Sequence, residues 1–174
     1  MLDGILYVLR TGCAWANWPE SYPPQSIGQD RLQHWLRTGV FQAALDDLAD
    51  VLADRGLLDW CECFLDGTFA PAQRGGSAVG KTKRGQGSKM MVVVEADGLP
   101  VAITIDSAHP HEVKLVEQTL EARFVEKLPA RLMGDNAYDS DGLDAALATQ
   151  GVEVIAPHRS KRQHKTQDGR PLRR

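Results

Sequence analysis

Two aspartates stand where apolar segments of the chain end, and their setting suits metal chemistry. Asp66 closes the run CFLD before Gly67, and Asp135 follows the run RLMG. In open α/β sheets, ligand sites collect at the carboxyl ends of strands. If the two segments are neighbouring strands, the carboxylates could share divalent metal such as Mg²⁺, which prefers hard oxygen ligands. Two such ions can stabilise the attacking and leaving oxygens of an in-line phosphoryl displacement.

Each aspartate alone also has a purely structural explanation. Asp66 precedes a glycine, as a turn would require, and Asp135 stands where a helix N-cap is expected. Taken singly, each residue fits the structural explanation better. A functional interpretation therefore requires that the two carboxylates lie close together in the folded protein.

Positive charge is concentrated in two stretches, although the chain as a whole carries a net charge of −3. Residues 74–89 contain no acid, and residues 158–174 contain Asp168 alone. Clustered cations displace counterions from a phosphate backbone, so both stretches are candidate DNA contacts, with solvated loops as the alternative. The candidate DNA-binding residues are Arg74, Lys81, Lys83, Arg84, Lys89, Arg159, Lys161 and Arg162.

The apolar spacing that must position these residues changes character after Trp60. Before that point it predicts helices over 2–11, from Ser26 as N-cap to Thr38, and from Val40 to Arg55. Beyond it, the pattern predicts strands at 61–66, 90–96, 100–106, 131–134 and 152–156, and helices over 111–127 and 140–150. Asp97-Gly98 between two apolar runs is a strong hairpin signal.

This order of elements predicts an α/β fold with a mixed sheet, preceded by a small all-α segment. We expect a helix-turn-helix-like segment over 1–58, an α/β domain over 59–157 and a basic tail over 158–174. The helical segment could equally be a packing domain that never touches DNA.

Four segments resemble the DDE transposases of bacterial insertion sequences, nearest the insertion-sequence-five branch. They are ILYVLRTGCAWANWPESYPPQSIGQDRLQHWLRTGVF, FLDGTFAPAQRGG, GKTKRGQGSK and MGDNAYDSDGLDAALATQGVEVIAPHRSKR, in the order that the family has them. The resemblance implies a ribonuclease H-like catalytic domain, with Asp66 and Asp135 as the first two catalytic acids and ligands of Mg²⁺ or Mn²⁺. It also implies DNA strand cleavage and strand transfer on transposon ends and target DNA, by a homo-oligomer assembled on DNA.

The family's third acid, a glutamate on a later helix, is not matched. After Ala156 the sequence holds one acid, Asp168, in a polar segment. We therefore expect a fragment incomplete at both ends, with weak or no strand transfer. The alternative is a non-catalytic DNA-binding or interaction remnant that modulates a full-length transposase.

One competing motif is the phosphate-binding P-loop, G-x-x-x-x-G-K-[ST], which the letters of residues 75–82 satisfy. That motif requires a buried strand directly before it and a helix directly after it. Here the preceding residues contain Pro71, and KRGQGSK is a poor helix opener. The sequence therefore favours a basic loop that grips DNA phosphates.

The cellular location is predicted from two features that the sequence lacks. No apolar run reaches the roughly 18 residues of a membrane span, and the three cysteines show no disulfide framework spacing. We expect a cytoplasmic protein without a membrane partner.

Overall fold

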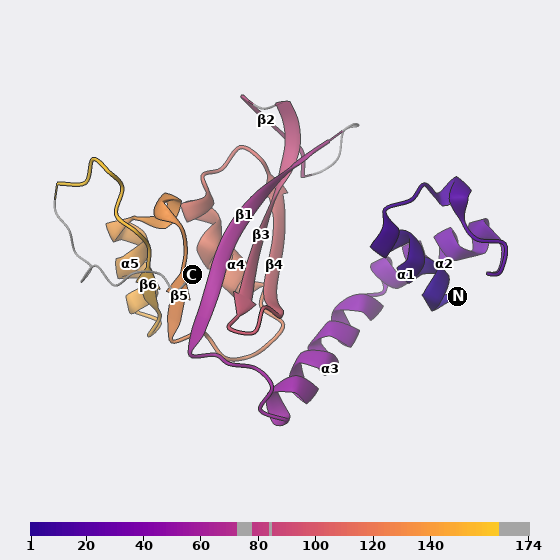
Figure 1. Ribbon diagram of the computed structural model, residues 1–174, viewed down its shortest axis with the longest axis horizontal. Helices are drawn as coiled ribbons and strands as arrows, with labels where there is room; N and C mark the ends of the chain where they lie inside the picture. Colours follow the sequence, from indigo (N-terminus) through magenta and orange to yellow (C-terminus); the bar gives the residue numbers. More distant parts are fainter. Residues whose placement is uncertain (73–77, 84, 164–174) are drawn as a thin grey trace. The chain divides into compact units, whose positions relative to one another are not determined.

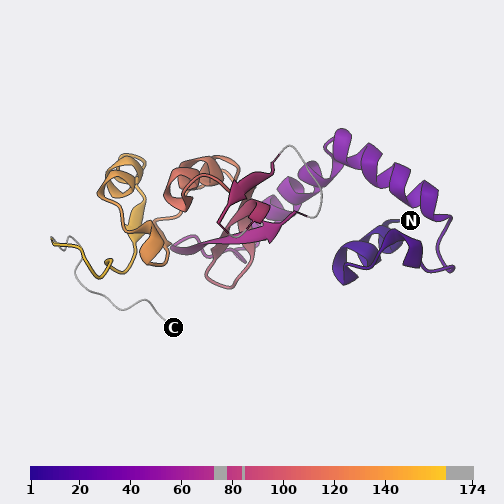
Figure 2. The same ribbon diagram turned by 90° about the horizontal axis from the view of Figure 1, so that it is seen from above.

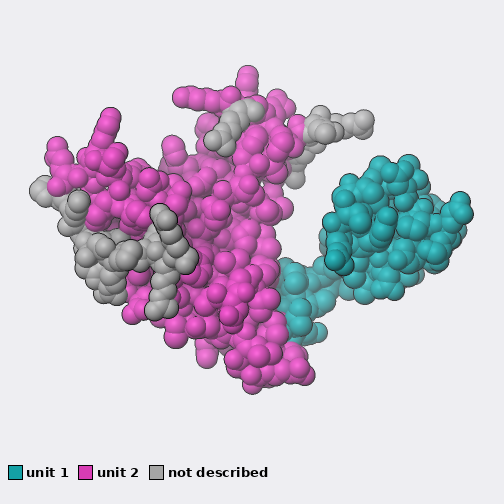
Figure 3. All heavy atoms as spheres, viewed as in Figure 1, with its two compact units in different colours: residues 1–48 teal, residues 49–174 magenta. Residues whose placement is uncertain are grey.

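The computed structural model describes residues 1–72, 78–83 and 85–163. It separates into two compact units, residues 1–48 and residues 49–174 (Figure 3), and each is described by itself. The predicted divisions after residues 58 and 157 stay predictions. None of the helices that it describes is long and apolar enough to cross a membrane.

The first unit consists of short helices that glycines separate. Helix α1 (Leu2–Thr11) ends at Gly12, whose φ of 64° is left-handed and suits a residue without a Cβ. The 3₁₀ turn η1 (Trp15–Asn17) follows, then α2 (Gln25–Arg37) and the start of α3 (Val40–Asp54). The three α-helices lie within two residues of their predicted bounds.

The predicted cap of α2 is wrong. The observed N-cap is Pro24, two residues before Ser26, and no side chain accepts a hydrogen bond there. The proline ring fixes φ, so the extended lead-in ends at Pro24 and Ser26 is already helical.

Trp18 fills the space between α1 and α2. A Cβ on Gly4 would lie 2.5 Å from the ring carbon Cη2, and a Cβ on Gly28 would lie 2.7 Å from the same atom. The indole N–H donates to the Pro23 carbonyl at 2.8 Å. Trp18 is therefore a packing residue, with its one polar atom satisfied within the unit.

The second unit is built on a six-stranded mixed sheet (Figure 1). Its strands are β1 (Glu62–Pro71), β2 (Gly80–Thr82), β3 (Gly85–Glu95), β4 (Pro100–Ser107), β5 (Arg131–Met133) and β6 (Glu153–Ile155). Strand β3 pairs antiparallel with β1, β2 and β4, whereas β5 pairs parallel with both β1 and β6. The predicted mixed sheet is confirmed, and β2 is a strand that the sequence pattern did not predict.

Two helices cover one face of this sheet. Helices α4 (Val116–Glu121) and α5 (Asp141–Ala148) lie on the same side (Figures 1 and 2), and 3₁₀ turns η2 (Glu112–Leu115) and η3 (Asn136–Tyr138) precede them. The core between helices and sheet includes Cys63, Leu65, Leu132, Val154, Val116, Leu120, Leu143 and Leu147.

The predicted helix over 111–127 is wrong at its end, because α4 stops at Glu121. Beyond it the backbone turns back to β4. Arg123 forms a bridge with Ala102, and the Phe124 N–H donates to the Val101 carbonyl at 2.9 Å. This pairing over a long sequence distance overrides the local helical pattern.

Replacement of Leu132 should weaken the second unit, since this side chain lies on β5, between β1 and β6, and is 1% exposed. We expect Leu132→Ala to lower the free energy of unfolding by about 2–5 kcal/mol, through lost burial and the cavity left behind. Urea unfolding measures this change. Ile105→Ala is the control, because Ile105 is 60% exposed and its truncation should cost less than about 0.5 kcal/mol.

Candidate active site

Parallel pairing of β1 with β5 brings the two aspartates level with each other. The register pairs Glu62 with Arg131 and Phe64 with Met133. Continued by two residues, it sets Asp66 beside Asp135 on strands that lie about 4.8 Å apart. The Gly134 N–H donates to the Ile155 carbonyl at 3.0 Å, so the extended chain of β5 continues to the residue before Asp135.

A row of ion pairs identifies the sheet face that the aspartates share. Arg131 pairs with Glu62 on β1 at 3.2 Å and with Glu153 on β6 at 3.3 Å. Side chains alternate between faces along a strand. Since Asp66 and Asp135 each stand four positions beyond a member of this row, the alternation directs both carboxylates toward the same face.

Both carboxylates are exposed, and each accepts a hydrogen bond from a nearby backbone N–H. Asp66 Oδ1 accepts from Gly67 at 2.7 Å, and Asp135 Oδ1 accepts from Ala137 at 2.7 Å. Asp135 is thus the N-cap of η3. Within the part of the chain that the structure describes, the Oδ2 atoms accept no hydrogen bond, so each carboxylate keeps an oxygen for a ligand.

The buried side chain of Tyr138 lies next to these acids. Its side chain is 1% exposed, and its ring packs so closely on Gly134 that a Cβ there would lie 2.5 Å from it. Burial raises the pKa of the Tyr138 hydroxyl above its usual range, and the carboxylates of Glu112, Asp66 and Asp135 raise it further. The hydroxyl lies near Glu112 but makes no hydrogen bond of normal geometry to the described residues. It is therefore a neutral group surrounded by acids.

Glu112 is a carboxylate that packs against Gly67, the residue after Asp66, and the spacing of the sequence did not reveal this contact. Its Cδ would lie 3.0 Å from a Cβ on Gly67, which places the side chain against the residue after Asp66. It forms an ion pair with Lys89 at 3.6 Å, and the Lys89 ammonium also donates to the Pro110 carbonyl at 2.7 Å. No spacing pattern links Glu112 to Asp66, since η2 reaches the sheet only through the tertiary fold.

The donor set fits a hard divalent cation that keeps part of its hydration shell. Mg²⁺ is commonly held by one or two carboxylates together with waters and substrate phosphates, and Asp66 and Asp135 offer two. Among the residues that the structure describes, no group of three or more His, Cys, Asp or Glu side chains is arranged to hold a metal ion. A cation held by Asp66 and Asp135 would therefore have only part of its ligand shell supplied by the described residues.

Three of the predicted DNA-binding residues of the first basic stretch line one cleft. Lys81, on β2, Lys83 and Lys89 line a hollow of about 760 Å³ beside η2. Arg74 and Arg84 lie outside the described residues. Because Gly80–Thr82 forms a strand that pairs with β3, the helix that a P-loop needs after its glycines is not present there.

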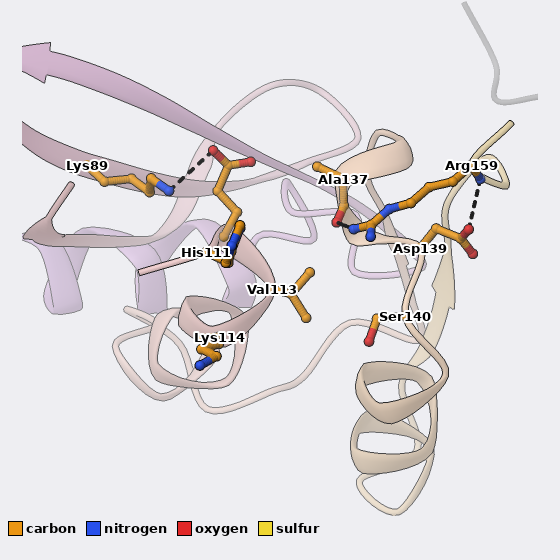
Figure 4. Close-up of a pocket in the computed structure, with 9 residues that line it drawn as sticks. Lys89, His111, Val113, Lys114, Ala137, Asp139, Ser140 and Arg159 are labelled. Carbon is orange, nitrogen blue, oxygen red and sulfur yellow. Dashed lines mark hydrogen bonds and ion pairs between the residues drawn. The ribbon is translucent and has the colours of Figure 1, made fainter. Parts of the chain in front are cut away.

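A second cleft, of about 450 Å³, lies between η2 and the turn that follows Asp135 (Figure 4). Lys89, Lys114 and Arg159 line it. The Arg159 guanidinium donates to the carbonyls of Asn136 at 3.1 Å and Ala137 at 2.7 Å.

The other two cations of the second basic stretch differ in their surroundings. Lys161 is exposed, whereas Arg162 bonds to the carboxylates of Asp139 and Asp141. Direct DNA contact by Arg159, Lys161 and Arg162 stays a prediction.

Asp139 connects residues 158–162 to the turn that follows Asp135 through hydrogen bonds and ion pairs. Its side chain is 2% exposed and bonds to the Arg159 N–H at 2.8 Å, the His158 imidazole at 3.1 Å and the Arg162 guanidinium. Burial opposes ionisation of Asp139, but the hydrogen bonds from Arg159 and His158 and the charge of Arg162 outweigh it, so the pKa lies below its ordinary value.

A family described as the transposase DDE domain matches residues 61–174, well over half of the chain. The chain belongs to the transposase DDE-domain family. A second family, described as "putative transposase of IS4/5 family", matches residues 1–45. The process served by these transposases is DNA transposition, and the mixed sheet has the ribonuclease H-like arrangement that the resemblance implied.

One protein and one solved structure are similar to parts of this chain. The uncharacterized protein y4sN of Sinorhizobium fredii (strain NBRC 101917 / NGR234) is 28% identical over 95 residues, which are 55% of this chain and 71% of that protein. A chain in the cryo-EM structure of the piggyBac transposase synaptic complex with hairpin DNA is 12% identical, with a TM-score of 0.40. That match covers 64% of this chain and spans 27% of the piggyBac chain.

Substitution of Gly67 tests the close approach of Glu112. A Cβ there would lie 2.9 Å from Met91 Sδ and 3.0 Å from Glu112 Cδ, so we expect Gly67→Ala to destabilise the DDE domain by about 1–3 kcal/mol. Gly142→Ala is the matched control, because a Cβ in α5 would meet nothing nearer than 3.9 Å and alanine favours a helix by up to about 1 kcal/mol. In urea unfolding, the free energy of unfolding should fall in Gly67→Ala and rise in Gly142→Ala. Equal effects would contradict the packing described here.

Acid titration tests the Asp139 cluster. Because the pKa of Asp139 is lowered by folding, its stabilising contribution is complete above the unfolded value of about 3.9 and is lost as pH falls through the folded pKa. We therefore expect Asp139→Asn to be less stable than wild type at neutral pH, with the gap closing below about pH 3.9. Asp97→Asn, in the exposed hairpin turn, controls for loss of a carboxylate. A gap independent of pH would contradict the assignment.

Proposed function

We propose that this chain carries the metal-binding part of a DDE transposase, in which Asp66 and Asp135 hold Mg²⁺ or Mn²⁺ for DNA strand cleavage and strand transfer. The supporting observation is the register of β1 and β5, which sets the two aspartates level on neighbouring parallel strands. Two carboxylates from distant parts of the sequence then face solvent together.

Divalent metal bound at these carboxylates would supply positive charge to a phosphodiester oxygen and lower the pKa of a water or 3′-hydroxyl nucleophile. The residues of the chain prepare that site. The N–H groups of Gly67 and Ala137 hold one oxygen of each aspartate and leave the other for the ion. Tyr138, buried and neutral, keeps water away from the inner side of the acids.

The two clefts offer a path for the DNA strand on either side of η2. Lys81, Lys83 and Lys89 border one, and Lys89, Lys114 and Arg159 border the other. Cations arranged along a groove track a phosphate backbone with little dependence on base sequence. Assembly of several copies on transposon ends and target DNA belongs to the same proposal.

Metal binding is the first test. The third acid that the resemblance implies has no match in this sequence, so a lack of catalytic turnover would not show whether Asp66 and Asp135 bind metal. Isothermal titration with Mn²⁺ should show a site in the wild type. Removing a direct ligand in Asp66→Asn or Asp135→Asn should weaken it by more than the roughly 10–100-fold typical of outer-shell partners. Asp97→Asn is the control, since it removes the same charge and leaves an Asn-Gly turn.

DNA binding separates the two candidate functions. The non-catalytic alternative predicts binding of a duplex that falls with salt and is unaffected by Asp66→Asn, with Mn²⁺ binding equal in wild type and variants. That combination, measured by fluorescence anisotropy and titration calorimetry, would overturn the catalytic proposal. Metal-dependent nicking of supercoiled plasmid that disappears in Asp66→Asn would support it.

A further inference from the structure

The turn that carries Asp135 is too short to hold its own geometry. Turn η3 has three residues, and its internal backbone bonds run from Tyr138 to Asp135 at 3.1 Å and from Asp139 to Asn136 at a marginal 3.5 Å. A single turn leaves carbonyl groups without helical partners. The orientation of Asp135 therefore depends on bonds from outside the turn.

Arg159 supplies those bonds. Its Nε and Nη2 atoms donate to the carbonyls of Asn136 and Ala137, the two residues that follow Asp135. The Ala137 N–H in turn donates to Asp135 Oδ1 at 2.7 Å. One guanidinium thus bonds to the Asn136–Ala137 peptide unit, whose N–H sets the aspartate's orientation, and to the peptide unit that follows it.

The backbone of Arg159 is fixed as well. Its N–H donates to Asp139 Oδ2 at 2.8 Å, and the same buried carboxylate bonds to His158 and Arg162. Both ends of the Arg159 residue are therefore attached to the segment 136–139, over a distance of about twenty residues in sequence. The planar fork of arginine can reach two carbonyls at once, whereas the ammonium of lysine acts as a single point charge.

We propose that Arg159 is a positioning residue for Asp135, holding the η3 turn so that the aspartate's free oxygen is presented to the metal. The inference rests on the proposed function of Asp66 and Asp135. It assigns Arg159 a role within the protein, in addition to any contact with DNA. Groups that orient metal ligands in this way typically affect metal affinity about 10–100-fold.

The test uses two readouts on the whole chain, in wild type, Arg159→Met and Arg159→Lys. Mn²⁺ affinity is measured by titration calorimetry, and exchange of the Ala137 amide is measured by NMR without metal. We expect Arg159→Met to bind Mn²⁺ about 10–100-fold more weakly and its Ala137 amide to exchange faster. Arg159→Lys should fall between the two, since it keeps the charge but loses the fork.

Arg123→Met is the matched control. Arg123 also binds backbone carbonyls, those of Leu120 and Glu126, but it adjoins β4, which β3 and β1 separate from β5. It should change neither Mn²⁺ affinity nor Ala137 exchange. An equal loss of Mn²⁺ affinity in Arg123→Met and Arg159→Met would show a general structural effect and overturn the proposal.

The direction of the change in Mn²⁺ affinity in Arg159→Met distinguishes a positioning role from a simple electrostatic effect. Loss of a positive charge near a cation site should strengthen Mn²⁺ binding, so unchanged or tighter binding in Arg159→Met overturns the proposal. If that variant does not fold, wild-type affinity and exchange in folded Arg159→Lys overturn it instead. Equal Mn²⁺ binding by wild type and Asp66→Asn would show failure of the proposed function, while Ala137 exchange still decides whether Arg159 holds the turn.

Discussion

Everything at the candidate site depends on the short parallel pairing of β1 with β5. Three residue pairs, from Glu62 with Arg131 to Phe64 with Met133, determine which residues stand level beyond them. A slip of one residue would send one aspartate to the opposite face of the sheet. The row Glu62–Arg131–Glu153 opposes such a slip, because opposite charges meet across three neighbouring strands only in the observed register.

Around that pairing, exposed carboxylates stand next to closely packed residues. Asp66 and Asp135 face solvent, yet the residues next to them are packed closely, with Met91 and Glu112 against Gly67 and Tyr138 against Gly134. Side chains at either glycine would push these neighbours away. The acids are therefore accessible to a ligand while their backbone is held by the core, which is the arrangement that precise metal binding requires.

The sequence allowed prediction of what depends on local pattern. The Asp97-Gly98 turn identified the β3–β4 hairpin, the apolar runs before Asp66 and Asp135 identified their strands, and the family motifs supported the pair. It could not show where α4 ends, because Arg123 and Phe124 pair with β4 through backbone groups that carry no sequence signal. The positions of Glu112 and Arg159 escaped prediction for the same reason, since both reach the site through contacts between distant segments.

The separation of β1 from β5 along the chain also dictates when this site can exist. Glu62 and Arg131, which bond to each other, are 69 residues apart, and such distant contacts form late because a long loop must close first. During synthesis, Asp66 emerges from the ribosome long before the strand that completes its pairing. A growing polypeptide therefore cannot bring Asp66 and Asp135 together until β5 is available.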